Sequence, residues 1–484
     1  MKTTVLIGME VHLQLRTKSK MFCRCPVRFG APPNTLVCPV CLGLPGSLPV
    51  PNRDAMLYAL SLATALGCTL AEQTKFDRKH YYYPGLPKGY QISQYDRPLA
   101  TGGELTVASE HGTTRVRVRR LHIEEDVGKS LHDDAVGLSR VDFNRAGTPL
   151  VEIVTEPDLS SAAEARAYLQ SLRALVEYLD ISDGNMQEGN LRCEPNVNLH
   201  IEEGGRVVKT PIIEIKNLNS VRNVERAIEL EIARHGAEYA EKGASFAQEP
   251  RATRGYDEAR DQTFEMRAKE EAHDYRYFPE PDIPPITITA AWRNEAAARV
   301  PELPAARRTR FLESYALSAY DADLLTRDRG LADYYEETVK AGAEPKPVAN
   351  WILGDMTRIA NEGKTIVPAL GLAPGRLAAF VALVESGGVA RLAAARDVLP
   401  RLLAGDEEPA AVVAALGLQP VEDDSVLRAA AAEAVAENPQ AAADVRAGKE
   451  KAFGALMGHV MRRTKGKANP DAVRRVLKAI LEMA

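Results

Sequence analysis

The chain has 484 residues, of which 45% are hydrophobic and 26% charged, so it is long enough for roughly two to four domains and too apolar to be disordered. The N-terminal segment MKTTVLIGMEVH lacks the unbroken apolar run of a signal peptide, and no stretch reaches the ~18 apolar residues of a membrane helix. We therefore expect a cytoplasmic protein with no membrane partner. In that reducing compartment, six cysteines favour metal binding over disulfides.

The net charge of -5 conceals an uneven distribution along the chain. From Arg446 to Ala484, ten Lys or Arg residues stand against three acidic residues, so this segment carries +7 and the remainder -12. A basic segment of this kind favours an anionic partner such as a nucleic acid. The alternative is a basic helical cap that only aids solubility.

The first predicted element is a half-buried strand over residues 5–15. Apolar side chains alternate with Glu10, His12 and Gln14, which places these three polar groups on one face. A solvated polar face is one interpretation of this pattern. The other is a divalent-cation or phosphate site, because Glu and His two residues apart on one face suit such ligands.

Four cysteines follow in a C-x-C and a C-x-x-C arrangement, at Cys23, Cys25, Cys38 and Cys41. Two such pairs at this separation are typical of a tetrahedral zinc site with thiolate ligands. Four thiolates leave no coordination position for water or substrate. The predicted zinc is therefore structural rather than catalytic, and it would fasten a loop-rich region.

Residues 76–99 combine five tyrosines with basic residues that include Lys79. Aromatic rings beside cations can stack on bases and bind phosphates. Half-buried tyrosines in an irregular loop are an equally good interpretation of this segment.

An acidic stretch over residues 121–158 is the most informative part of the chain. Glu152 lies inside the apolar run from Leu150 to Val154, where an unpaired charge would cost several kcal/mol. A buried carboxylate needs a cation nearby. Either a Lys or Arg neutralises Glu152 structurally, or Glu152 binds a metal together with Glu124, Glu125 and other groups.

The remaining patterns predict an α+β protein. Ser161 and Glu164 form a capping box for an amphipathic helix, and Pro195 makes the alternating segment 190–201 an edge or bulged strand. Beyond Trp292 the strand patterns stop and helical spacing takes over. We expect an α+β domain up to about residue 292, followed by about 190 residues that are helical.

Eight motifs, in this order, closely resemble the B subunit of the glutamyl/aspartyl-tRNA amidotransferases. They are GMEVHLQL, FDRKHYYYP, LPKGYQISQYD, LHIEEDVGKS, DFNRAGTPLVEIVTEPD, EIKNLNS, EEAHDYRYFPEPD and KGKANP. In that family, the B subunit uses ATP to phosphorylate the side-chain carboxylate of Glu-tRNA(Gln), and often of Asp-tRNA(Asn), and ammonia then displaces the phosphate. Some members lack the four cysteines, so zinc is not essential to the family's chemistry.

The resemblance implies an α+β cradle of largely antiparallel sheet with helices over residues 1–292, a helical domain over 293–405 and a basic helical tail domain over 406–484.

The resemblance also implies site residues, each still an expectation. Glu10, His12, Glu125 and Glu152 are candidate magnesium ligands; Glu124 and Glu194 lie near the same site, where Glu194 replaces a usual Asp; and Lys79 lies beside the phosphates or the ammonia path. Arg145 and Arg276 are candidate contacts for ATP or the acyl group. The expected cofactors are ATP, Mg²⁺ and structural Zn²⁺.

The resemblance also implies partners. Because the chain has neither a Gly-Gly-Ser-Ser amidase signature nor a convincing glutaminase cysteine, ammonia must come from another chain. In the family this is the amidase, or A, subunit, tied to the B subunit through a small C subunit. The tail is expected to bind the misacylated tRNA through Lys449, Lys451, Arg462, Arg463, Lys465, Lys467, Arg474 and Arg475. A non-catalytic, zinc-containing tRNA-binding scaffold and a metal-dependent RNA hydrolase are the alternatives.

Overall fold

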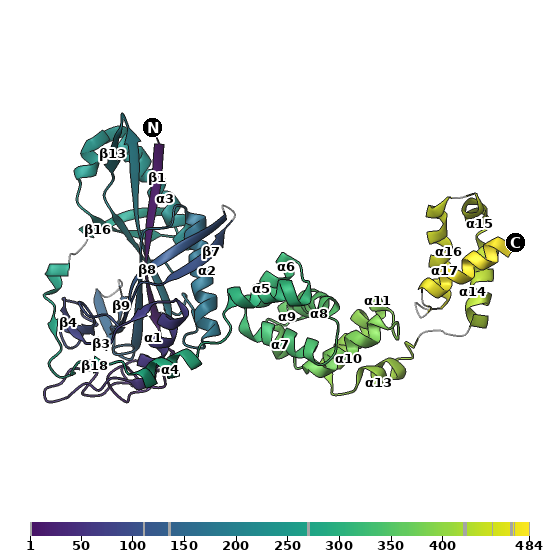
Figure 1. Ribbon diagram of the computed structural model, residues 1–484, viewed down its shortest axis with the longest axis horizontal. Helices are drawn as coiled ribbons and strands as arrows, with labels where there is room; N and C mark the ends of the chain where they lie inside the picture. Colours follow the sequence, from purple (N-terminus) through teal and green to yellow (C-terminus); the bar gives the residue numbers. More distant parts are fainter. Residues whose placement is uncertain are drawn as a thin grey trace. The chain divides into compact units, whose positions relative to one another are not determined.

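A computed structural model describes residues 2–109, 112–133, 137–268, 272–419, 424–447, 449–464, 468 and 470–483. The chain divides into two compact units, residues 1–303 and 304–484 (Figure 1). All the described strands lie in the first unit, and the second is helical, which confirms the predicted α+β class. None of the described helices has the length and apolar character needed to cross a membrane.

The first unit is built on one large sheet, in which the strand order is β16-β15-β14-β12-β1-β11-β8-β6-β2. Neighbouring strands are antiparallel except for the parallel pair β14 and β15, so the sheet is largely antiparallel, as predicted. In chain order its strands are β1 (Lys2–Gln14), β2 (Thr69–Leu70), β6 (Ala100–Thr101), β7 (Glu104–Ser109), β8 (Gly112–Glu125), β11 (Pro149–Thr155), β12 (Leu191–Glu203), β13 (Arg206–Lys209), β14 (Ile213–Lys216), β15 (Ala252–Asp257) and β16 (Gln262–Ala268).

Among the described residues, three small sheets, four α-helices and two 3-10 helices, Gly243–Gln248 and Ala272–Tyr275, complete the first unit. The small sheets pair β9 (Lys129–Asp133) with β10 (Leu138–Asp142), β4 (Asp77–His80) with both β5 (Tyr90–Ser93) and β17 (Phe278–Pro279), and β3 (Gln73–Thr74) with β18 (Ile286–Thr287). The helices are α1 (Arg53–Ala65), α2 (Ala162–Tyr178), α3 (Val221–Lys242) and α4 (Ala290–Ala298).

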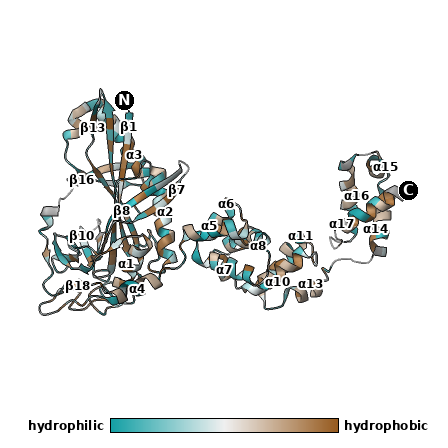
Figure 2. Cartoon of the chain, viewed as in Figure 1, coloured by the Kyte–Doolittle hydropathy of each residue, from teal (hydrophilic) through white to brown (hydrophobic). Residues whose placement is uncertain are grey.

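Strand β1 has the predicted alternation. Val11 and Leu13 are fully buried, whereas Glu10, His12 and Gln14 are only half-buried on the opposite face. The apolar face of the sheet shares one hydrophobic core with the inner sides of α1 and α2, and Figure 2 shows hydrophobic residues along these elements. One face of the sheet is therefore fixed by apolar burial, which leaves the other face for polar groups.

Ser161 caps the helix as predicted, but the Glu164 side chain bonds the residue before the cap and not the cap itself, so the predicted capping box is formed only in part. The Ser161 hydroxyl accepts a hydrogen bond from the Glu164 amide, and the Glu164 carboxylate accepts one in return from the Ser160 amide. The helix that follows, α2, buries Tyr168 and Leu172 against the core. These contacts fix where the chain leaves the acidic stretch and turns over the sheet.

The prediction that Pro195 marks an edge or bulged strand is wrong. Strand β12 lies inside the sheet, between β1 and β14, with Pro195 opposite Met9 in a continuous register. A proline fits there because β14 pairs with β12 only at Asn196 and Val197, so the ladder on that side does not extend to Pro195.

The second unit consists of short helices. They are α5 (Pro304–Tyr315), α6 (Ala319–Thr326), α7 (Arg329–Lys340), α8 (Pro345–Trp351), α9 (Thr357–Glu362), α10 (Pro374–Glu385), α11 (Arg391–Ala393), α12 (Leu399–Ala404), α13 (Pro409–Ala415), α14 (Asp424–Glu437), α15 (Pro439–Arg446), α16 (Glu450–Arg463) and α17 (Pro470–Met483).

Hydrophobic cores extend past two of the boundaries that the sequence suggested. Helix α4 runs across residue 292, and it packs into the core of the first unit through Ala296, beyond that boundary. Residues 311–413 form a second core, which runs past residue 405 because Val412 and Val413 belong to it. Residues 427–481 form a third, separate core.

A buried carboxylate braces the second core. Glu336 on α7 is 7% exposed and pairs with Arg307 and Arg310 of α5, and its Oε1 also accepts a hydrogen bond of 3.1 Å from the Tyr315 hydroxyl. Burial alone would raise the pKa of Glu336, but the hydrogen bonds from Arg310 and Arg307 lower it to about 2. This group ties α7 to α5.

We predict that Glu336→Gln destabilises the second core by on the order of 3 kcal/mol at neutral pH, because the buried Arg307 and its neighbour Arg310 both lose their carboxylate. A lowered folded-state pKa means that the stabilisation is fully present above the unfolded-state pKa of about 4.3 and is lost as the pH falls toward 2. The chain has two tryptophans, so a Trp292→Phe background leaves Trp351 to report urea unfolding of this core.

The neighbouring exposed residue gives the matched control. Glu337→Gln should change the free energy of unfolding by less than about 0.5 kcal/mol. The interpretation fails if Glu336→Gln and the parent protein are equally stable at neutral pH, or if their difference stays constant between pH 5 and pH 2.

Candidate active site

Charged side chains collect on the polar face of the large sheet. Strand alternation brings them to this face from five adjacent strands, β14, β12, β1, β11 and β8. They are Glu214 and Lys216, Arg192 and Glu194, Glu10 and His12, Glu152, and His122 and Glu124, respectively. In the strand register, His12 stands opposite Glu152 of β11 on one side and opposite Arg192 of β12 on the other. The strand pairing therefore sets these three side chains in one row across the sheet.

Three of these groups converge on one point. His12 Nε2 lies 3.6 Å from Glu124 Oε1 and 3.4 Å from Glu152 Oε2, and the ligand atoms of all three residues lie within 4.8 Å of one another. Two carboxylates and one imidazole suit a divalent cation, and the partly exposed side of His12 leaves room for water or substrate oxygens. These residues fit the Mg²⁺ expected here.

The electrostatics of this group are strongly coupled. Burial would lower the pKa of His12, but the charge and hydrogen bond of Glu152 and the charge of Glu124 raise it to about 9. Burial would conversely raise the pKa of Glu152, but His122 and His12 hold it well below its usual range. The pKa of Glu124 is likewise lowered against the effect of burial, chiefly by the hydrogen bond with His122. Both carboxylates are therefore ionised, as ligands for a cation must be, whereas His12 carries a proton at neutral pH that a bound cation would have to displace.

A second acidic group adjoins the first. Glu10, Glu194 and Glu214 place carboxylate oxygens within 4.8 Å of one another, and Lys216 pairs with Glu194 and lies 3.7 Å from Glu214 Oε1. Asn196 donates a 2.8 Å hydrogen bond to Glu10. The structure thus places Glu10 and Glu194 on the predicted face, but in a second cluster whose positive charge comes from Lys216.

Glu125 is not part of either group, contrary to the grouping predicted from the sequence. Its carboxylate lies 2.6 Å from Lys88 Nζ and accepts a 3.0 Å hydrogen bond from the Ile92 amide. The reason is the strand itself, because adjacent residues point to opposite faces and Glu124 already occupies the face of His12.

Lys79 and aromatic rings lie close to these carboxylates. The Lys79 ammonium lies 4.7 Å from the centre of the Tyr275 ring and 5.8 Å from that of Tyr81. Burial would lower the pKa of Lys79, but the charges of Glu124 and Glu152 raise it well above its usual value. Tyr277 stacks on Tyr95 with ring centres 4.3 Å apart, which adds a second pair of aromatic rings to those of Tyr275 and Tyr81.

The two predicted arginine contacts differ in their surroundings. Arg145 donates hydrogen bonds to the carbonyl oxygens of Val127 and Gly128 and lies 3.6 Å from Asp126. These contacts stabilise the loop at residues 126–128. Arg276 is exposed, in a left-handed backbone conformation with φ of 44°. Its side chain has no ion-pair partner among the described residues, so it is open to an anionic ligand.

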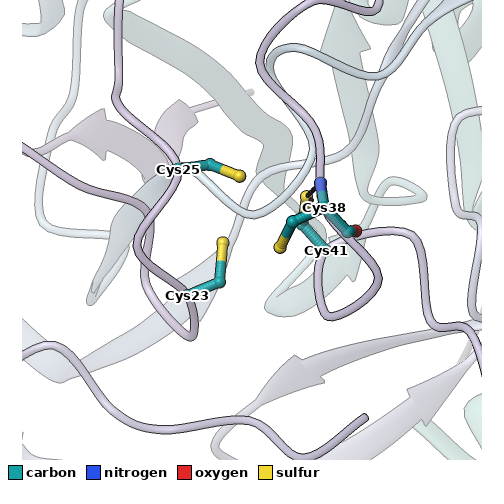
Figure 3. A group of neighbouring side chains, drawn as sticks. All are labelled: Cys23, Cys25, Cys38 and Cys41. Carbon is teal, nitrogen blue, oxygen red and sulfur yellow. Dashed lines mark hydrogen bonds between the residues drawn. The ribbon is translucent and has the colours of Figure 1, made fainter.

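The four cysteines come together as predicted. Their sulfur atoms lie within 4.8 Å of one another, and Figure 3 shows the side chains of two separate loops turned toward a shared space. Four thiolates at this spacing fit a tetrahedral zinc ion. The Cys38 amide donates a 3.2 Å hydrogen bond to Cys41 Sγ, which orients that sulfur atom.

This cysteine cluster is joined to the rest of the unit by buried contacts. Lys20 is 1% exposed, and its ammonium lies 3.5 Å from Cys41 Sγ. A cavity of about 150 Å³ separates the cluster from the pair formed by Lys88 and Glu125. The Asn144 side chain donates a 2.7 Å hydrogen bond to a backbone carbonyl of the cysteine loop, which links this loop to the acidic stretch.

The basic residues predicted to bind tRNA lie around the third core. The six that the structure describes are all exposed: Lys449, Lys451, Arg462, Arg463, Arg474 and Arg475. Two of them form ion pairs, Lys449 with Asp444 at 3.0 Å and Arg463 with Glu433 at 2.9 Å. Lys465 and Lys467 lie outside the described residues.

Four residues of the polar face were not predicted as site residues from the sequence: His122, Arg192, Glu214 and Lys216. His122 contacts both Glu152 and Glu124, and it stands two residues before Glu124 in one strand, so alternation could have found it. Glu214 and Lys216 also alternate in a short strand. No local pattern shows that this strand is placed next to β12, because that pairing joins distant segments.

Comparison with known proteins gives matches over nearly the whole chain. The family described as the GatB/GatE catalytic domain matches residues 5–294, and the GatB domain family matches residues 333–481. Relatives named as the B subunit of aspartyl/glutamyl-tRNA(Asn/Gln) amidotransferase include those of Oleidesulfovibrio alaskensis, 48% identical over 97% of both chains, and Thermotoga maritima, 43% identical over 100% of both. The resemblance seen in the sequence is confirmed: the chain belongs to the family of amidotransferase B subunits.

Proposed function

We propose that this chain is the activating subunit of a tRNA-dependent amidotransferase. It uses ATP to phosphorylate the side-chain carboxylate of a misacylated Glu-tRNA(Gln), Asp-tRNA(Asn) or both, and the acyl phosphate is converted to the amide by ammonia. The observation that carries this proposal is the row formed by His12, Glu124 and Glu152, with Lys79 beside it. Family membership supports the reaction class.

The proposed chemistry has two steps. An oxygen of the side-chain carboxylate attacks the γ-phosphorus of ATP, and ADP leaves. Ammonia then attacks the acyl carbon, and inorganic phosphate leaves with the oxygen that it received. A carboxylate is a poor acyl donor until it is phosphorylated, which is why ATP is needed.

The residues of the polar face suit the first step, in which anionic groups must approach one another. His12, Glu124 and Glu152 would hold Mg²⁺, which when bound offsets the negative charge of the transferring phosphoryl group. Lys79 supplies a fixed positive charge for the substrate carboxylate or the phosphates. Arg276, which is exposed, would meet an anionic part of the substrate.

Ammonia is proposed to come from partner chains, an amidase A subunit held in the complex through a small C subunit. Outside the zinc cluster, the chain has two cysteines, Cys68 and Cys193. Burial raises the pKa of Cys68 to about 11, and it raises that of Cys193 well above its usual value. Neither thiol is therefore available as the thiolate nucleophile that glutamine hydrolysis would need.

Two other functions compete with this proposal. A non-catalytic tRNA-binding scaffold would need the basic tail and the zinc, and a metal-dependent RNA hydrolase would use the clustered carboxylates. ATP consumption by the complete complex separates them. The amidotransferase consumes ATP when misacylated tRNA is present, the scaffold never does, and the hydrolase cleaves RNA without ATP.

Glu152→Gln is predicted to lower the rate of ATP-dependent activation of the misacylated tRNA by on the order of a hundredfold or more, because a charged ligand of the cation is lost. Free ammonium as amide donor excludes effects on the partner's glutaminase. Titration with Mn²⁺ should show that Glu152→Gln and Glu124→Gln lose cation binding.

Glu125→Gln is the matched control for this prediction, since it alters the residue next to Glu124 on the opposite face of β8. It should retain Mn²⁺ affinity. Loss of Mn²⁺ binding in Glu125→Gln, with normal binding in Glu124→Gln, would move the cation to the other side of the strand and refute the proposed site.

For the cysteines, we predict one tightly held zinc ion per chain in freshly purified protein, measured by elemental analysis. The Cys23→Ser variant should lose zinc and be less stable and less soluble than the wild type. The molecules of this variant that do fold should keep the wild-type activity per molecule. Cys68→Ser, which alters a thiol outside the cluster, should keep its zinc. Zinc-free wild-type protein would exclude the site.

The tail is proposed to bind the body of the tRNA while the first unit holds the aminoacyl end. Replacing both Arg462 and Arg475 by Ala should weaken tRNA binding and reduce the slope of log Kd against log salt by about two, since each arginine contacts phosphate. Replacing both Arg396 and Arg401 is the charge-matched control on other exposed helices. Equal effects of both pairs would indicate only a general influence of net charge.

A further inference from the structure

His122 is a buried histidine that the proposed chemistry does not use. It is 6% exposed, and it stands on β8 directly across from Glu152 on β11. His12 stands across from Glu152 on the other side. Glu152 is therefore held between two histidines in one row across three strands.

The two histidines make different contacts. Nε2 of His122 lies 3.1 Å from Glu152 Oε2 and 3.8 Å from Glu124 Oε2, whereas Nε2 of His12 lies 3.4 Å from Glu152 Oε2 and 3.6 Å from Glu124 Oε1. His12, Glu124 and Glu152 form the compact set of possible ligand atoms, and His122 is outside it. The His12 side chain is also the more exposed, at 18% against 7% for His122.

These differences assign different roles. A magnesium ion keeps several waters or substrate oxygens, so its protein ligands must open toward solvent, as His12 does. His122 lies behind the carboxylates, where it can contact one lone pair of Glu152 Oε2 and leave another for a cation. Contacts of this kind orient carboxylate ligands in metal sites.

We propose that His122 is a positioning residue, which holds the Glu152 carboxylate in the orientation in which Glu152, Glu124 and His12 bind one divalent cation. This inference depends on the proposed function, because it concerns the same cation. The Nε2 contact with Glu152 fixes an oxygen that otherwise could rotate away from His12, so the site is formed before the cation arrives.

Replacing His122 tests this role through cation binding. In the complete complex without ATP or tRNA, Mn²⁺ binding is measured from the signal of free Mn²⁺. His122→Leu removes the contact and should raise the Kd for Mn²⁺ by about ten- to a hundredfold. His122→Gln, which places an amide N–H near the position of Nε2, should stay close to wild type, whereas His122→Asn, whose shorter side chain cannot reach Glu152, should behave like the leucine variant.

The matched control is His235→Leu. His235 is also fully buried in the first unit, but its Nδ1 lies 2.8 Å from the Thr210 hydroxyl, away from the carboxylate row. This variant should lose stability and keep its Mn²⁺ affinity. In steady-state assays, His122→Leu should need more Mg²⁺ for half-maximal ATP consumption, with kcat largely recovered at saturating Mg²⁺.

The outcomes separate this inference from the proposed function. If wild type binds Mn²⁺, Glu152→Gln abolishes that binding and His122→Leu leaves it unchanged, the positioning role is overturned and the cation site stands. If wild type binds no Mn²⁺ that depends on Glu152, both proposals are overturned. Should His122→Leu fail to fold, the comparison of His122→Gln with His122→Asn decides, and equal Mn²⁺ affinities for these two would overturn the positioning role.

Discussion

The burial of ionised carboxylates on one face of the large sheet is the constraint on which the rest of the first unit depends. Each carboxylate on this face would cost several kcal/mol if it were unpaired. When no metal ion is bound, the sheet meets that cost by placing protonated His12 and His122 on either side of Glu152, and Lys216 beside Glu194. The apolar packing of the opposite face fixes the register that holds these groups together.

The local patterns of the sequence identified much of this arrangement. Alternation in residues 5–15 predicted which side of β1 is polar, and Glu152 stood out because it interrupts an apolar run. The cysteine spacing predicted a cluster that the structure brings together. These features depend on neighbouring residues, so one sequence suffices to predict them.

Other features depend on contacts between distant segments, and the sequence alone did not resolve them. Glu124 and Glu125 are adjacent acids in one strand, and only the packing of β8 decides which faces His12. Glu214 joins the face because β14 pairs with β12. Pro195 looked like an edge signal, yet it lies in an interior strand because the neighbouring ladder is short.

The most direct test of carboxylate activation follows the oxygen atoms. The side-chain carboxylate of the misacylated tRNA is labelled with ¹⁸O, and the complete complex converts it to the amide with ATP. Attack of the carboxylate on the γ-phosphorus predicts that each amide is formed together with ADP and an inorganic phosphate that carries one ¹⁸O atom. Transfer of the label to AMP, or an unlabelled phosphate, would contradict phosphorylation of the carboxylate at this site.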